Sequence, residues 1–216
     1  MVKLMSYKTV FPLYAYAALA LINVIFPRAV FAHHPMGGAA PGTAWQGFAS
    51  GIAHPIIGLD HLAFVIAIGF FCALCRVRNI GFPVALISAS VLGSLVRWNE
   101  ISIFYGELFV AVSVLVAGVF LLLRTRKMIA FSGIATIGAL FHGFAYGEAV
   151  IGAESTHVIA YLFGLSLIQI TIALTVYGLA DRLIKMHRKD NNSIWVTSGA
   201  GVSLVGMAHL ALLIAA

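Results

Sequence analysis

Long apolar runs between short charged segments are the feature that most limits how this chain can fold. A helix needs about 20 apolar residues to cross a bilayer, and the chain holds one such run near its N-terminus and six after it. Only 9% of the 216 residues are charged and 62% are hydrophobic, whereas about 25% of a typical soluble domain is charged. So few charges cannot cover a soluble globule, and so apolar a chain is not disordered. The sequence therefore predicts an all-α, polytopic membrane helix bundle.

The N-terminal run, Val10–Ala32, has the pattern of a secretory signal peptide. Lys3 and Lys8 precede it, and it ends with small residues at its last and third-last positions. An uncleaved anchor helix is the alternative. We expect cleavage after Ala32, which divides the chain into a signal peptide, residues 1–32, and a membrane domain, residues 33–216.

Six transmembrane helices are expected in the membrane domain. Their predicted bounds are Ala44–Cys75, Gly81–Val96, Ile101–Leu123, Met128–Tyr146, His157–Leu183 and Ile194–Ala216. With the mature N-terminus outside, nine lysines and arginines fall in inward loops and only Arg97 falls in an outward loop. This bias predicts a multi-pass protein of the cell (inner) membrane with both mature termini outside. The excess of basic residues is then explained by the orientation of the protein in the membrane and by contact with anionic lipid. It gives no reason to expect that the protein binds nucleic acid.

Ionisable side chains at membrane depth are expensive and therefore mark candidate functional sites. The densest set is His54-Pro-Ile-Ile-Gly-Leu-Asp60-His61 in the first span. His54 and His61 share a helical face but would lie about 10.5 Å apart along a straight helix, too far to bind one ion. Either Pro55 bends the helix sharply, or the two histidines are successive binding positions along the path of a transported ion. Histidines that only hold the bundle together are the structural alternative.

A second polar set closes the fourth span. His142 and Tyr146 share a face, and the glycine at 147 would permit a break that turns Glu148 inward. His142 is expected at the same depth as His54. Two imidazoles with carboxylates nearby suit a divalent transition metal such as nickel, cobalt or zinc, whereas carboxylates alone would suit magnesium or calcium.

Other candidate residues carry weaker signals. Glu107 lies early in the third span, where an interfacial carboxylate is the alternative, and His33 and His34 would open the mature chain as an outer capture point or a flexible terminus. The pair Cys72 and Cys75 could receive a soft metal, but cysteines on an apolar helix are more often small buried hydrophobes. The remaining histidines, His157 and His209, are isolated in sequence and are expected to be bundle residues.

These motifs resemble the HupE/UreJ family, small membrane proteins regarded as nickel permeases linked to hydrogenase and urease maturation. The match begins at His33-His34-Pro and is most specific at residues 54–61, which look like the family signature H-P-x-x-G-x-D-H. Residues 107–113 look like the third-helix segment of the family, and residues 141–148 look like its H-G-x-A-H-G-x-E region. The signal peptide and the six-span layout also agree with the family.

The resemblance implies that His54, Asp60, His61 and His142 carry the metal path, with nickel as the metal. The chain departs from the family pattern at two positions that bear on the choice of metal. Tyr146 stands where many relatives have histidine, and Glu148 follows Gly147 directly instead of coming one residue later. Glu154 could supply the displaced carboxylate.

The predicted function is a secondary permease that moves a divalent transition metal inward, with nickel first and cobalt, zinc or copper as alternatives. No P-loop is present, no enzymatic activity is predicted, and no permanently bound cofactor is expected because the metal is the cargo. A metal-binding accessory or sensor that does not transport stays open, since it would need the same ligands. The metal ion and membrane lipid are the expected partners; a homo-oligomer and a link to hydrogenase or urease maturation proteins also stay open.

A rhomboid-like intramembrane serine protease is the rival from another class. Ser50 within Phe-Ala-Ser-Gly and His209 in the last span resemble fragments of that pattern. The serine lies in the first span instead of a middle one, and this interpretation leaves residues 54–61 unexplained.

Overall fold

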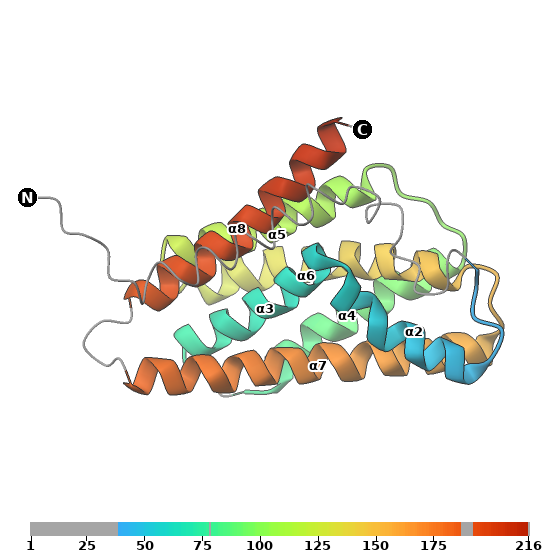
Figure 1. The fold of residues 1–216 in the computed structure, drawn as a ribbon, viewed down its shortest axis with the longest axis horizontal. Coiled ribbons are helices and arrows are strands. Elements are labelled where there is room, and N and C mark those ends of the chain that lie inside the picture. Colours follow the sequence, from blue (N-terminus) through green and yellow to red (C-terminus); the bar gives the residue numbers. More distant parts are fainter. Residues whose placement is uncertain (1–38, 78, 187–191, 216) are drawn as a thin grey trace, which may run out of the picture.

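The structure is a computed structural model that describes residues 39–77, 79–186 and 192–215. Every regular element in these ranges is helical (Figure 1). The elements are α2 (Ala44–Ile57), α3 (Leu59–Leu74), α4 (Gly81–Trp98), α5 (Gly106–Leu122), α6 (Met128–Gly147), the short 3-10 helix η2 (Glu148–Val150), α7 (Ser155–Met186) and α8 (Asn192–Ala215). The predicted signal peptide, residues 1–32, and the candidate ligands His33 and His34 lie outside the described residues.

Within the described ranges, four helices are long and apolar enough to cross a membrane by length and composition: α4, α6 with η2, α7 and α8. The pair α2 and α3 adds a fifth span if the two count as one, and α5 is an apolar helix of 17 residues. Large apolar side chains such as Leu92, Ile137 and Phe163 are exposed on the outside of the bundle, as they would be against lipid. These are the properties of a multi-pass membrane protein, and the count of six spans stays a prediction.

The first predicted span is broken in two. Helix α2 continues through Pro55 and ends at Ile57, and α3 begins at Leu59 after a bend of 79°. Gly58 joins the two helices in an extended conformation, and Figure 1 shows α2 and α3 meeting at this bend above α7. A β-carbon on Gly58 would lie 2.6 Å from Cδ2 of His61, so a side chain at this joint would displace the His61 imidazole.

The helices pack mainly in three pairs: α2 on α7, α4 on α6, and α5 on α8. Glycines let the paired backbones approach closely. A β-carbon on Gly51 would collide with the carbonyl of Tyr161, and one on Gly143 would collide with the carbonyl of Ser90. Gly133 differs, since a β-carbon there would meet nothing within 4 Å.

The two ends of the bundle differ in charge. The described cations of the loops at one end are Arg76, Arg124, Arg126 and Lys127, with Arg182 and Lys185 near the end of α7. We call this end, predicted to face the cytoplasm, the inner end. Apolar residues fill the neighbouring half of the bundle, where the rings of Phe71 and Phe131 stack with centroids 3.5 Å apart. Asp60 and the buried histidines of the bundle lie in the other half.

Candidate metal site

Three buried histidines from three helices meet beside the bend. His54 lies near the end of α2, His61 near the start of α3 and His142 in α6, and each is at most 2% exposed. The ring centroids of His54 and His61 are 5.7 Å apart, and those of His61 and His142 are 4.9 Å apart. The Nδ1 atoms of His61 and His142 are separated by only 2.6 Å. The bend at Gly58 therefore replaces the long separation of a straight helix with side-by-side rings.

Buried aromatic and hydroxyl groups hold these rings in place. Tyr146 packs against His54 and His61, with ring centroids 5.2 Å and 4.4 Å away. The hydroxyl of Tyr161 lies 3.0 Å from Nδ1 of His54, and the ring of Phe64 stacks on His142 at 4.2 Å. This packing excludes bulk water from the imidazoles, which strengthens their electrostatic interaction with a cation.

A second cluster adjoins the first and contains Asp60, Glu107 and His209. Nε2 of His209 lies 3.6 Å from Oδ2 of Asp60 and 3.4 Å from Oε2 of Glu107, and one ligand atom from each residue falls within 4.8 Å of the others. Two ligand atoms that bind the same ion at about 2 Å lie about 3 Å from each other. Small movements of these side chains would therefore let them bind one cation. Asp60 and His61 are adjacent in sequence, which joins the two clusters.

His209 is the site residue that the sequence did not identify. It lies in α8, far along the chain from Asp60 and Glu107, and no spacing rule connects it to them. The packing of α8 on α5, and of both helices on α3, brings the three together. The contacts of His209 with two carboxylates give the serine protease interpretation no support, since that interpretation needs this imidazole as the base for Ser50.

A cavity of about 230 Å³ opens next to the second cluster. Its lining residues are Arg97, Ser102, Ile103, Gly106, Glu107, Phe144, Ala145 and Glu148. The Glu107 side chain is about half exposed, at 48%, while Asp60 and His209 are buried. Glu107 therefore contacts both the cavity and the buried cluster.

Glu148 lies on the wall of this cavity and is not brought to the histidines. Its carboxylate Oε2 accepts a hydrogen bond of 2.6 Å from Nε of Arg97, whose guanidinium also lies over the ring of Phe144. Glu154, the other carboxylate considered, is exposed and 4.0 Å from Nε2 of His157. His157 also forms a 3.0 Å hydrogen bond with the carbonyl of Pro41, as expected of a histidine that serves packing.

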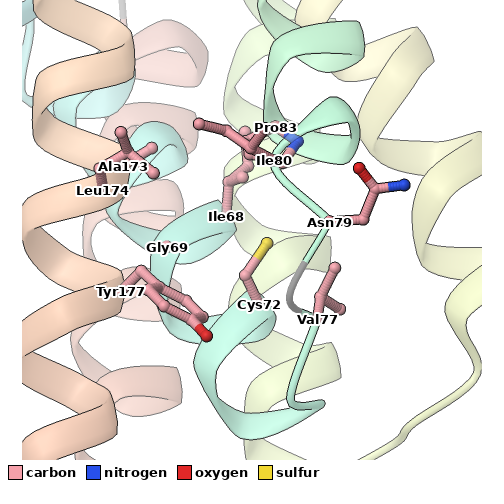
Figure 2. Close-up of a pocket in the computed structure, with 10 residues that line it drawn as sticks. All are labelled: Ile68, Gly69, Cys72, Val77, Asn79, Ile80, Pro83, Ala173, Leu174 and Tyr177. Atoms are coloured by element: carbon pink, nitrogen blue, oxygen red, sulfur yellow. The ribbon is translucent and has the colours of Figure 1, made fainter.

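The two cysteines lie away from these clusters, towards the inner end. Figure 2 shows Cys72 beside a mostly apolar pocket of about 190 Å³ between α3, α7 and the start of α4. Cys72 is the only histidine, cysteine or acidic residue among the ten that line it. The pocket does not have the ligands of a metal site.

Comparison with known proteins agrees with the motifs. Residues 19–210 match the family described as HupE / UreJ protein. A curated relative, Protein HupE of Rhizobium leguminosarum bv. viciae, is 26% identical over 196 residues, which cover 90% of this chain and 94% of the relative. No solved structure matches the chain. Because the family match extends over most of its length, the chain belongs to the HupE/UreJ family.

Proposed function

We propose that this protein is a permease that moves a divalent transition metal, most favourably nickel, inward across the cell membrane without ATP. The observation that carries the proposal is the meeting of three buried imidazoles from α2, α3 and α6 next to a cluster of two carboxylates and a fourth imidazole. Buried ionisable groups inside a membrane are costly and are rarely present without a function.

The donor set supports a transition metal. Imidazole nitrogens are borderline ligands that suit nickel, cobalt, copper and zinc, whereas magnesium and calcium prefer oxygen. The choice of nickel comes from the family resemblance. Tyr146, where many relatives have histidine, packs on two of the three imidazoles, so metal preference is to be measured directly.

The arrangement of the two clusters supports a path. A cation in the 230 Å³ cavity would meet Glu107 first, then Asp60 and His209, and then the three histidines. Beyond them the stacked rings of Phe71 and Phe131 close the inner half of the bundle. Release towards the inner end therefore requires the helices to move, as in alternating access.

Uptake of radioactive nickel by proteoliposomes tests the proposal. The purified wild-type protein, His61→Ala and His142→Ala are compared with His157→Ala, whose imidazole lies outside both clusters. We expect uptake by the wild type and His157→Ala and a loss of at least tenfold in the two site variants, by analogy with the 10- to 100-fold effects known for lesser changes around metal sites.

Three results would contradict parts of the proposal. Equal uptake by all four proteins would mean that His61 and His142 take no part in transport. Binding without uptake by the purified wild type would indicate an accessory protein. Faster uptake of cobalt, zinc or copper than of nickel in the same vesicles would reassign the metal.

A further inference from the structure

We propose that Tyr161 and Ser113 are positioning residues, which fix the ring tautomers of His54 and His142 so that particular nitrogens face the metal. This inference rests on the proposed function. A neutral imidazole carries one N–H and one lone pair on its two ring nitrogens, and only the lone pair can bind a metal. Whatever accepts the N–H therefore decides which nitrogen is the ligand.

The hydroxyl of Tyr161 has one hydrogen and two neighbours. It donates to the carbonyl oxygen of Tyr146 at 2.8 Å, because a carbonyl can only accept. The same hydroxyl oxygen must then accept from Nδ1 of His54, which is 3.0 Å away. His54 consequently carries its hydrogen on Nδ1 and its lone pair on Nε2.

The hydroxyl of Ser113 repeats this arrangement at His142. It donates to the carbonyl oxygen of Val110 at 2.8 Å, so it accepts from Nε2 of His142 at 3.0 Å. The lone pair of His142 is then on Nδ1, the atom that faces Nδ1 of His61 at 2.6 Å. The serine thus directs the lone pair of His142 towards the centre of the histidine cluster.

Both hydroxyls are protected from competing water, since Tyr161 is fully buried and Ser113 is 7% exposed. They belong to α7 and α5, which carry none of the three clustered histidines. Both are also neutral, whereas a carboxylate in this position raises the basicity of the ligand. A neutral partner orients the ring and leaves metal binding weak enough for release, which a transport path needs.

The first test reads the tautomers directly in the full-length, metal-free protein in detergent micelles. Long-range ¹H–¹⁵N spectra of histidine-labelled protein distinguish Nδ1–H from Nε2–H, and loss of signals in His54→Gln and His142→Gln assigns them. We expect Nδ1–H for His54 and Nε2–H for His142 in the wild type. Tyr161→Phe and Ser113→Ala should each give a mixture of tautomers at the histidine that they contact.

The second test measures binding of nickel and cobalt to the same proteins. Tyr161→Phe and Ser113→Ala should weaken binding about 10- to 100-fold. Tyr177→Phe and Ser166→Ala are the matched controls on α7. Tyr177 lines the pocket near the inner end, and Ser166 donates to Leu162 of its own helix; both controls should stay within about twofold of the wild type.

The opposite tautomers in the wild type would overturn the inference, and this result does not depend on the folding of Tyr161→Phe or Ser113→Ala. Unchanged affinity in both Tyr161→Phe and Ser113→Ala would overturn it as well. The expected tautomers in a wild-type protein that binds neither nickel nor cobalt would contradict the proposed function and leave the tautomer assignment in place.

Discussion

Gly58 controls the position of His61 at the bend. Its backbone has φ −74° and ψ 101°, which alanine can adopt, so Gly58→Ala would strain the contact with the His61 ring and not the backbone. We expect Gly58→Ala to weaken nickel binding about tenfold because the imidazole must move. Titration calorimetry on the purified proteins measures this effect.

Gly178→Ala in α7 is the control for this change, since a β-carbon at Gly178 meets nothing within 4 Å. It should bind nickel like the wild type. If both alanine variants bind alike, the close approach of Gly58 to His61 has no part in the site.

His209 supplies a test of the second cluster. The His209→Ala variant would remove the imidazole whose Nε2 lies 3.6 Å from Oδ2 of Asp60 and 3.4 Å from Oε2 of Glu107. We expect nickel uptake by proteoliposomes to fall at least tenfold, because a ligand is lost. His157→Ala should transport normally, and equal uptake by the two variants would limit the metal path to the other three histidines.

At the scale of the helices, hydropathy predicted where the apolar segments lie but not how the first one is divided. The predicted span Met128–Tyr146 and helix α6, Met128–Gly147, differ by one residue. The span Ala44–Cys75 instead became two helices that meet at Gly58, because hydropathy reports how apolar a segment is and not whether its backbone bends. Pro55 pointed to a break, and the chain bends three residues later.

The sequence predicted those parts of the site that follow from helical spacing and from depth in the membrane. Spacing placed His54 and His61 on one face, and depth placed His142 beside them. Spacing could not supply His209, which the packing of α8 on α3 brings to Asp60. The pairing of Glu148 with Arg97 is likewise a contact between residues of two different helical segments.

Because α4 packs closely on α6, replacing two glycines of α6 with alanine should change the stability of the protein in opposite directions. In Gly143→Ala the new β-carbon would collide with the carbonyl of Ser90, and such overpacking costs about 1–3 kcal/mol. In Gly133→Ala the β-carbon meets nothing within 4 Å, and alanine favours a helix over glycine by about 0.5–1 kcal/mol. Thermal unfolding in detergent should therefore show a lower midpoint for Gly143→Ala and an equal or higher one for Gly133→Ala. A lower midpoint for both would mean that the α4–α6 contact is not what restricts Gly143.

At the scale of the whole molecule, the charge distribution predicts orientation. Arg76, Arg124 and Arg126 lie at one end of the bundle, and Arg97 is paired with Glu148 in the opposite half. By the positive-inside rule we expect the first end to face the cytoplasm and the C-terminus to lie outside. Alkaline phosphatase, which needs the disulfides of an oxidising compartment, should be active when fused to the C-terminus. A fusion after Thr125 should be inactive, and the reverse pattern would invert the proposed topology.

Metal binding should also stabilise the bundle as a unit, because the candidate ligands come from five helices: α2, α3, α5, α6 and α8. An ion that binds only the folded protein adds about 2.7 kcal/mol to the free energy of unfolding at a concentration 100 times its dissociation constant. We expect nickel to raise the unfolding midpoint of the wild type, and a chelator to reverse the increase. Magnesium should give no shift, since it prefers six oxygen ligands, and nickel should give a smaller shift in His61→Ala. An equal shift in His61→Ala would mean that the stabilising ion binds elsewhere, because the histidine cluster cannot hold it with the same strength after one of its ligands is removed.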